Sequence, residues 1–368
     1  MKILRIFSLT SVVVYTVLLL FSCGRMSENG SGGRDNLKET RSIPTSIINK
    51  LKEESVPVLY QIKATSVQEE NLVSYGFSST KSGKIIYTGS CFGSTSPVSI
   101  NKKTDEPYRL TFPELAVEDM ANASALLLKK LGIDSIKVLV GPSLGGMKAL
   151  AFSILHNTYV KNLILISSAT QALPYAIAMR SLQREVIRKD PLWNNGFYSY
   201  ENPPLNGVRI ARKIGMVSYR SSLEWTQRFG RKRSEDNKLN QNTFGIENTS
   251  FEFEIESYLE HQAVKFQNIF DANCYLYLSR AMDWFDIAKH GESTLDAISK
   301  TNIEKALILG VSTDILFPPQ QQKEIAELLS ISNTIVEYKE LDCLQGHDSF
   351  LVDTSTFSEE IIKFVKNL

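Results

Sequence analysis

A serine at the apex of a glycine-rich turn is the residue of this chain best suited to covalent chemistry. Ser143 lies in the hexapeptide G-P-S-L-G-G (141–146), after an apolar, β-branched run (136–140) and before an alanine- and leucine-rich stretch (147–156). Strand, tight turn and helix in this order, with G-x-S-x-G at the turn, expose a serine hydroxyl above a parallel sheet. The helix points its N-terminus at that serine, so the backbone N–H of Leu144 is predicted to stabilise a developing oxyanion. A glycine-rich turn with a purely structural role is the alternative.

The residues that would activate this serine follow it in the chain. A serine hydroxyl is a poor nucleophile until a base removes its proton, and the base needs an acid to fix its tautomer. Of the four histidines, only His347 follows the last apolar strand-like run (335–341), in a Gly-His-Asp turn. Asp314 follows the preceding run. Alone, each residue is more often structural, but serine, acid and histidine in this order predict the triad Ser143, Asp314, His347.

These residues require a parallel sheet whose strands alternate with helices. Continuous apolar runs predict buried strands at 136–140, 162–168 and 305–311. Between about 172 and 295 the alternation stops, and the chain carries aromatic-rich stretches of helical character. We therefore predict an α/β protein with a mostly parallel sheet, a core of residues 46–171 and 296–368, and an inserted helical cap of residues 172–295.

Composition indicates an ordinary globular protein and gives no reason to expect nucleic acid as a partner. The 368 residues are 43% hydrophobic and 22% charged, with a formal net charge of +1. The basic run 228–233 is followed at once by acidic residues, and we interpret it as a solvated helix end. The spacing of Cys91, Cys274 and Cys343 predicts neither a disulfide framework nor a metal site. In its short loop, Cys91 is predicted to be a small buried residue.

The N-terminus is predicted to be an export signal. Lys2 and Arg5 precede an apolar run (6–21), and the tetrapeptide L-F-S-C ends at Cys23. This tetrapeptide resembles a bacterial lipobox, in which the cysteine becomes a lipidated N-terminus. Residues 1–23 are therefore predicted to be a signal peptide, 24–45 a flexible tether, and the protein an exported, membrane-anchored lipoprotein. An uncleaved signal anchor and a cytoplasmic location are the alternatives.

Beyond the serine turn, the chain resembles the homoserine O-acetyltransferase family (MetX type), whose members have the α/β-hydrolase fold. The resemblance covers roughly residues 84 to 368. The motifs that carry it are G-S-C-F-G-S-T-S-P (89–97), the serine turn (141–146), A-R-K-I-G (211–215) with Tyr219, R-F-G-R (228–231), E-S-Y-L (256–259), the segment 265–283, D-I-L-F-P-P (314–319) and G-H-D-S-F (346–350).

The resemblance implies an acyl transfer in methionine biosynthesis. Acetyl-CoA would acylate Ser143 as co-substrate, with no bound cofactor or metal, and the hydroxyl of homoserine would take the acetyl group. His347 would deprotonate first the serine and then the acceptor. The family match further implies that Arg212 binds the α-carboxylate of the acceptor and Asp348 its α-ammonium, with a weaker match at Tyr219. Family members tend to dimerise through the cap, and the aromatic-rich insertion allows a homodimer.

Two departures from the family keep other functions open. Members usually carry a strand ending in a motif like A-L-T-G, which supplies a second oxyanion N–H. The region between Leu72 and Gly89 is too short to contain it and has no such motif, so we place the loss between Ser78 and Lys84. Loss of one oxyanion donor costs on the order of 100- to 1000-fold in turnover. An export signal would also separate the protein from acetyl-CoA.

An exported acyl-ester hydrolase and a non-catalytic homologue are therefore the alternatives. The amino-acid clamp of Arg212 and Asp348 favours the transferase, because an esterase has no use for it. The sequence does not distinguish homoserine from serine as the acceptor, nor acetyl from another acyl donor.

Overall fold

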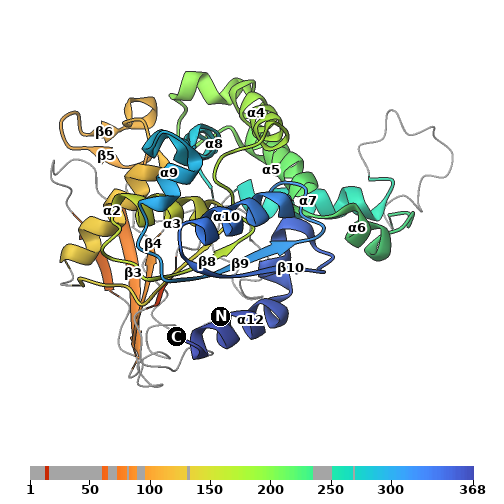
Figure 1. The fold of residues 1–368 in the computed structure, drawn as a ribbon. Coiled ribbons are helices and arrows are strands. Elements are labelled where there is room, and N and C mark those ends of the chain that lie inside the picture. The colour runs from red at the N-terminus through yellow and green to blue at the C-terminus, as the bar shows by residue number, and fades with distance from the viewer. Residues whose placement is uncertain are drawn as a thin grey trace.

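The computed structural model describes residues 13–15, 60–64, 73–80, 83–88, 96–130, 133–234, 251–267 and 270–368. Within these residues, an eight-stranded sheet has the strand order β10-β9-β8-β7-β1-β4-β3-β2 (Figure 1). The strands are β1 (Val13–Tyr15), β2 (Tyr60–Ala64), β3 (Val73–Thr80), β4 (Gly83–Thr88), β7 (Val138–Pro142), β8 (Asn162–Ile166), β9 (Lys305–Val311) and β10 (Ile335–Leu341). Strands β2, β3 and β4 pair antiparallel, and the remaining neighbours pair parallel. The predicted α/β class with a mostly parallel sheet is confirmed.

Helices cover both faces of the sheet. They include α2 (Val117–Lys130), α3 (Leu144–Leu155), α10 (Pro319–Ile331) and α12 (Thr354–Lys366). Because successive side chains of a strand point to opposite faces, Leu163 and Leu165 of β8 join the cluster formed with α2, α3 and α10. Ile164 and Ile166 join a second cluster, formed with α12 on the other face (Figure 1). Two apolar faces explain why β7 and β8 are buried along their whole length.

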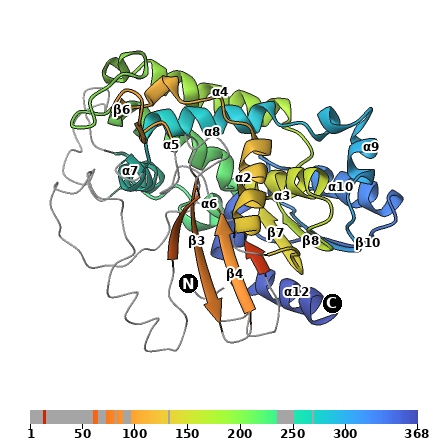
Figure 2. The ribbon, with the colours of Figure 1, turned by 90° about the vertical axis from the view of Figure 1, so that its left-hand side faces the viewer.

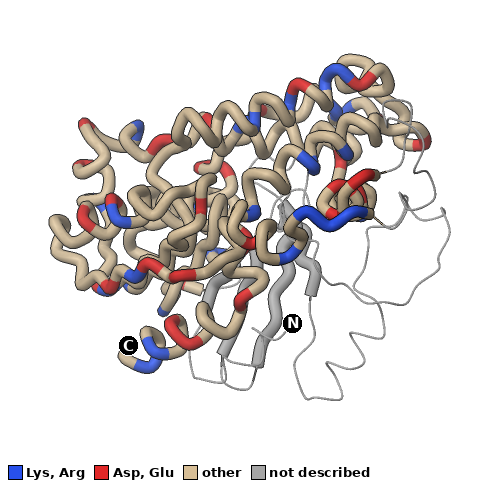
Figure 3. Tube along the Cα trace, turned by 90° about the vertical axis from the view of Figure 1, so that its right-hand side faces the viewer, with Lys and Arg blue, Asp and Glu red and all other residues tan. Residues whose placement is uncertain are grey.

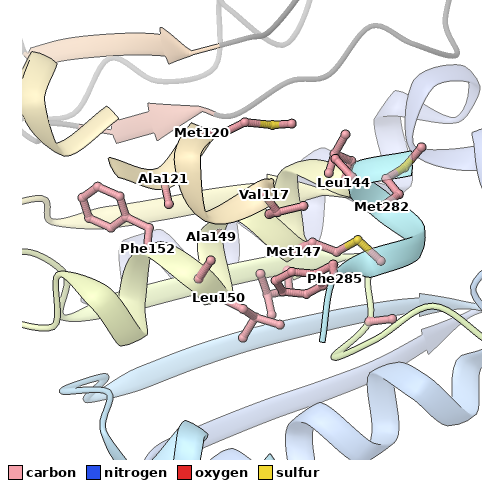
Figure 4. Close-up of a cluster of buried hydrophobic side chains, with 14 of the residues drawn as sticks. Val117, Met120, Ala121, Leu144, Met147, Ala149, Leu150, Phe152, Met282 and Phe285 are labelled. Carbon is pink, nitrogen blue, oxygen red and sulfur yellow. The ribbon is translucent and has the colours of Figure 1, made fainter. Parts of the chain in front are cut away.

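The larger cluster extends from α2 and α3 into the following helices. Figure 4 shows Val117 and Met120 of α2 beside Leu144 and Met147 of α3, with Phe285 from the far end of the helical insertion in the same cluster. The helix that carries the serine turn is therefore held from several sides. Eleven of its twelve residues are buried, so its N-terminus has little freedom to move.

The segment predicted to be the cap is helical where the structure describes it. Its helices are α4 (Pro174–Arg188), η3 (Pro191–Gly196), α5 (Leu205–Tyr219), α6 (Ser222–Arg228), α7 (Glu254–Gln267), α8 (Ala272–Trp284), η6 (Ile287–His290) and α9 (Thr294–Ser299). Figures 1 and 2 both show α4, α5 and α8 lying across one end of the core. The remaining short elements are β5 (Ile100–Asn101), β6 (Glu106–Pro107), η2 (Arg109–Thr111), η7 (Gly346–Asp348) and α11 (Ser349–Val352).

Strand β1 occupies the position between β4 and β7 and runs parallel to both. Val14 is in register with Ile86 of β4 and with Leu139 of β7. Part of the apolar run predicted to be an export signal is therefore placed inside the sheet. Cys23 and the rest of the predicted leader and tether lie outside the described residues, as does Cys91, so lipidation at Cys23 and burial of Cys91 stay predictions.

The hairpin of β3 and β4 is tight. Thr80 pairs with Gly83 across it, which leaves two residues between the strands. This agrees with the expectation that the segment 78–84 has no room for the additional family strand. The sheet position between β4 and the serine strand β7 is filled by β1 instead.

Charges of both signs are interspersed along the described chain (Figure 3). The basic run at the end of α6 is exposed, and one of its arginines, Arg233, pairs with Glu252 at 3.1 Å. This fits the interpretation of a solvated helix end. Within the described ranges, none of the helices combines the length and the apolarity that crossing a membrane requires. The predicted membrane anchor and the predicted cap-mediated homodimer stay predictions.

Candidate active site

Ser143 lies at the junction of β7 and α3 in a strained backbone conformation. Its φ of 52° and ψ of −127° are unusual for a residue with a side chain, and such strain persists only where the surroundings enforce it. Here the Ser143 N–H donates to the carbonyl of Ile166 at 2.9 Å, and the Ser168 hydroxyl donates to the Ser143 carbonyl at 2.9 Å. The neighbouring strand β8 and the loop after it therefore fix the turn on both sides.

The glycines of the turn are required by close backbone approach. A Cβ at Gly141 would lie 2.3 Å from the carbonyl oxygen of Gly145, and a Cβ at Gly146 would lie 2.3 Å from the hydroxyl oxygen of Ser168. Neither contact is sterically possible without movement of the chain. The spacing of glycine around Ser143, which predicted the turn, therefore has a direct physical cause.

The structure brings Ser143, His347 and Asp314 into one hydrogen-bonded chain. His347 Nε2 lies 2.8 Å from Ser143 Oγ, and His347 Nδ1 lies 2.7 Å from Asp314 Oδ2. All three residues are buried. With the proton on Nδ1, His347 donates to the carboxylate, and its Nε2 is free to accept the proton of the serine hydroxyl. This geometry can activate a serine nucleophile.

Asp314 is held by the loop that follows β9. Its Oδ1 accepts hydrogen bonds from the backbone N–H groups of Leu316 and Phe317, each at 2.9 Å. These bonds leave Oδ2 for the histidine. The backbone N–H groups of the loop 314–317 therefore fix the orientation of the Asp314 carboxylate.

The backbone N–H of Leu144, the predicted oxyanion donor, lies at the start of the helix that follows Ser143. Leu144 is the first residue of α3, and an N–H in the first turn of a helix has no acceptor within that helix. It lies beside the nucleophile at the positive end of the helix dipole. Strand β1 runs parallel to β7. The residues that follow Tyr15 lie outside the described ranges.

Arg212 and Tyr219 both lie on α5 in the helical insertion, and Tyr219 packs near His347. The guanidinium of Arg212 lies over the rings of Phe266 at 4.9 Å and Tyr219 at 5.7 Å, and the Tyr219 ring centroid is 6.3 Å from that of His347. Burial raises the pKa of the Tyr219 hydroxyl well above its usual value, so this group is neutral. Tyr219 is therefore adjacent to His347, and Arg212 lies behind Tyr219.

Asp348 completes this group from the loop that carries the histidine. It is buried, and its Oδ1 makes no hydrogen bond with the part of the chain that the structure describes. Burial raises the pKa of the Asp348 carboxyl to about 6, while the positive charges of Arg212, His347 and Arg220 act in the opposite direction. A buried acceptor atom beside a positive cluster is suited to a ligand that brings its own N–H donors.

Two arginines near the site were not found by sequence reasoning. Arg220 Nη1 lies 4.0 Å from Asp348 Oδ2, and its partner Glu224 is four residues further along the chain. Arg220 is the extended residue that follows α5, whereas Glu224 lies in α6, so helical spacing does not predict this ion pair. Arg180 of α4 binds Asp283 of α8 at 2.5 Å, a pairing across the fold that no local pattern indicates.

The described residues contain no group of three or more histidine, cysteine, aspartate or glutamate side chains arranged to hold a metal ion. The serine, the histidine and the carboxylate described above form the hydrogen-bonded chain of this site. Their arrangement supports transfer of an acyl group through a covalent serine intermediate, to water or to another hydroxyl.

Comparisons with known proteins agree with this chemistry. Residues 75–354 match the model of the α/β-hydrolase fold family. The chain is 47% identical over 281 residues to a serine O-succinyltransferase of Stenotrophomonas maltophilia, covering 76% of this chain and 75% of that protein. A serine O-succinyltransferase of Xylella fastidiosa is 49% identical over 281 residues, which cover 76% of this chain and 75% of that protein.

A solved structure shows the same fold. The crystal structure of homoserine O-acetyltransferase from Bacillus anthracis matches with a TM-score of 0.70 at 23% identity and covers 77% of each chain. The fold, the family model and the curated relatives lead to one assignment. The chain belongs to the α/β-hydrolase family and, within it, to the MetX-type acyltransferases.

Proposed function

We propose that this protein transfers a succinyl group from succinyl-CoA to the hydroxyl of L-serine. The observation that carries the proposal is the hydrogen-bonded chain of Ser143, His347 and Asp314 in a sequence 47% identical to a serine O-succinyltransferase. The resemblance noted in the sequence implied acetyl-CoA and homoserine. The curated relatives favour a different donor and acceptor within the same reaction type.

In the first half-reaction, Ser143 Oγ attacks the thioester carbonyl while His347 Nε2 takes its proton. The negative charge that develops on the carbonyl oxygen is stabilised by the N–H of Leu144 and the dipole of α3. The imidazolium of His347 is stabilised by Asp314. Collapse of the tetrahedral intermediate breaks the carbon–sulfur bond, His347 returns the proton to the coenzyme A thiolate, and Ser143 carries the acyl group.

In the second half-reaction, the acceptor hydroxyl replaces the thiol. Arg212 binds the α-carboxylate of the amino acid and Asp348 its α-ammonium, while Tyr219 packs between Arg212 and His347. His347 removes the proton of the acceptor hydroxyl as that oxygen attacks the carbonyl carbon of the acyl-enzyme. Collapse of the tetrahedral intermediate breaks the bond from that carbon to Ser143 Oγ, and His347 returns the proton to Oγ. Holding both charged ends of the acceptor aligns its hydroxyl and disfavours water.

A positive cluster in the cap supports a dicarboxylic acyl group over acetyl. Arg180 and Arg184 share one carboxylate, Asp283, so the cluster carries one positive charge in excess. Arg180 Nη2 is buried and makes no hydrogen bond with the described residues. The charge of Arg180 also acts on Tyr219 and Tyr275, which places it near the candidate site. Succinyl differs from acetyl by a terminal carboxylate, the group that such an arginine binds well.

The test is an acyl-transfer assay with purified full-length protein. Succinyl-CoA and acetyl-CoA are each supplied with L-serine, with L-homoserine or with no acceptor, and free thiol and product mass are followed. The proposal expects serine-dependent thiol release from succinyl-CoA that disappears in Ser143→Ala. A preference for acetyl-CoA and homoserine would replace the proposed substrates. Ser143-dependent thiol release that ignores both amino acids would indicate a hydrolase, and the absence of any release from folded protein would overturn the proposed activity.

A further inference from the structure

Arg220 lies at the corner between α5 and α6, where the cap meets the loop of the catalytic histidine. It is buried, and its guanidinium makes a bidentate interaction with the carboxylate of Glu224. Nε donates to Oε2 at 2.7 Å, and Nη2 donates to Oε1. The third nitrogen, Nη1, points to Asp348, with 4.0 Å to Oδ2. The arginine is therefore oriented by one carboxylate and directed at another.

The backbone keeps these two residues together. At Gly346 φ is +67°, and a Cβ there would lie 2.9 Å from the N of Ser221 and 3.0 Å from the carbonyl carbon of Arg220. The hydroxyl of Ser221 also donates to the carbonyl of Leu344. The turn that presents Asp348 is thus pressed directly onto the residue that precedes α6, and a shift of one would move the other.

A separation of 4.0 Å is too long for a hydrogen bond but short enough for strong charge attraction in a buried site. The positive charge of Arg220 therefore stabilises the ionised carboxylate of Asp348, while Asp348 Oδ1 makes no hydrogen bond with the described residues. A side chain that donated directly would compete with a ligand for the carboxylate. This geometry stabilises the negative charge and leaves the oxygen available.

Several other groups act on the same carboxylate. The charged or titratable groups that face Asp348 are Arg212 and Tyr219 from α5, Arg220 from the corner after α5, Tyr258 from α7, Asp314 after β9 and His347 beside it, with Glu224 of α6 behind Arg220. Arg212 is the stronger positive neighbour, but its proposed role is to bind the acceptor carboxylate. Once an acceptor is bound, that carboxylate offsets the charge of Arg212, and the cation that remains for Asp348 is Arg220.

We infer that Arg220, held by Glu224, is a positioning residue that orients Asp348 and keeps it negatively charged for the α-ammonium of the acceptor. This inference rests on the proposed function, because it assumes an amino-acid acceptor. It predicts a defect confined to the second half-reaction. Formation of the acyl-enzyme on Ser143 needs neither Asp348 nor Arg220.

The experiment compares Arg220→Gln, Arg220→Lys and the matched control Arg228→Gln in the full-length protein. Arg228 is exposed, is the last residue of α6 and contacts Tyr258. Acyl-enzyme formation from succinyl-CoA is measured by mass spectrometry, and kcat/KM for L-serine is measured between pH 5.5 and 8.5. We expect Arg220→Gln to acylate at the normal rate but to lose about two- to tenfold in kcat/KM for serine at pH 7, because loss of a nearby opposite charge raises a carboxyl pKa by about one unit or more.

The sign of the pH effect separates this role from a purely structural one. In the plot of kcat/KM for L-serine against pH, Arg220→Gln should move the acidic limb to higher pH. Arg220→Lys should restore the position of that limb in part, and Arg228→Gln should match the unmodified protein. The double variant Arg220→Gln/Asp348→Asn should be no worse than Asp348→Asn alone, since residues that act through one another are not additive.

Failure of the two proposals can be distinguished. No acylation or no serine dependence in the unmodified protein would overturn the proposed function. If the unmodified protein uses serine and the pH dependence of kcat/KM for serine is unchanged in Arg220→Gln, the role of Arg220 would be overturned. An equal loss in both half-reactions, or additive effects in the double variant, would assign Arg220 to structural support and overturn the inference as well.

Discussion

The ring of Phe317 is stacked on the imidazole of His347, with 5.0 Å between the ring centroids and 24° between the planes. The backbone N–H of the same phenylalanine donates to Asp314 at 2.9 Å. One residue therefore packs against the base through its side chain and holds the acid through its main chain. Because Phe317 is buried, its ring fixes the plane in which the imidazole can reach Ser143.

Replacing Phe317 by alanine should lower both stability and turnover. The cavity should cost about 3–5 kcal/mol in the free energy of unfolding, measured by urea denaturation. Turnover should fall further than the loss of folded protein explains, because the imidazole can then rotate away from Ser143. The matched control is Phe364→Ala, a buried phenylalanine of α12 in the cluster on the other face of the sheet. Equal losses of kcat per folded molecule in both variants would show that Phe317 only fills space.

Asp314→Asn should abolish most of the activity without unfolding the protein. An amide at this position keeps an oxygen for the N–H groups of Leu316 and Phe317, but its NH₂ group faces His347 Nδ1. The histidine must then carry its proton on Nε2, where it can no longer accept one from Ser143. We expect turnover to fall by about 10⁴-fold with little change in melting temperature. A loss below tenfold would mean that Asp314 does not set the tautomer.

The reactive residues could be predicted from the sequence because their constraints are local. The glycines around Ser143 are imposed by contacts within the turn and with the next loop, and Asp314 and His347 each follow a recognisable apolar strand. Continuous apolar runs also identified β7, β8 and β9, because strands covered on both faces have no polar side.

Other features depend on contacts between distant segments and leave no local signal. Arg180 and Asp283 meet only because α4 packs on α8, 103 residues apart in the chain. The approach of Arg220 to Asp348 depends on the close turn at Gly346. The apolar run 6–21 fits both the core of an export signal and a buried strand, because a short apolar run has no periodicity that separates the two.

Arg180→Met should change the donor preference more than the overall activity. If Arg180 Nη2 binds the terminal carboxylate of the succinyl group, its loss removes a charge-assisted hydrogen bond, and kcat/KM for succinyl-CoA should fall by about 10- to 100-fold. The value for acetyl-CoA should change little. Arg188→Met is the matched control, because Arg188 lies on the same helix and is exposed. A parallel loss with both donors would remove Arg180 from donor selection.

The role of the N-terminal apolar run can be tested through β1. A truncated protein that starts at Ile43 lacks the strand that joins β4 to β7. Each lost ladder hydrogen bond should cost about 0.5–1.5 kcal/mol, so the melting temperature should fall. In the full-length chain, Val14→Pro should have the same effect, because proline removes a backbone donor from a central strand. The mass of the protein purified from cells shows whether the segment is retained. A mature chain that begins at Cys23 and is as stable as the full-length protein would exclude β1 from the working fold and support the predicted export signal.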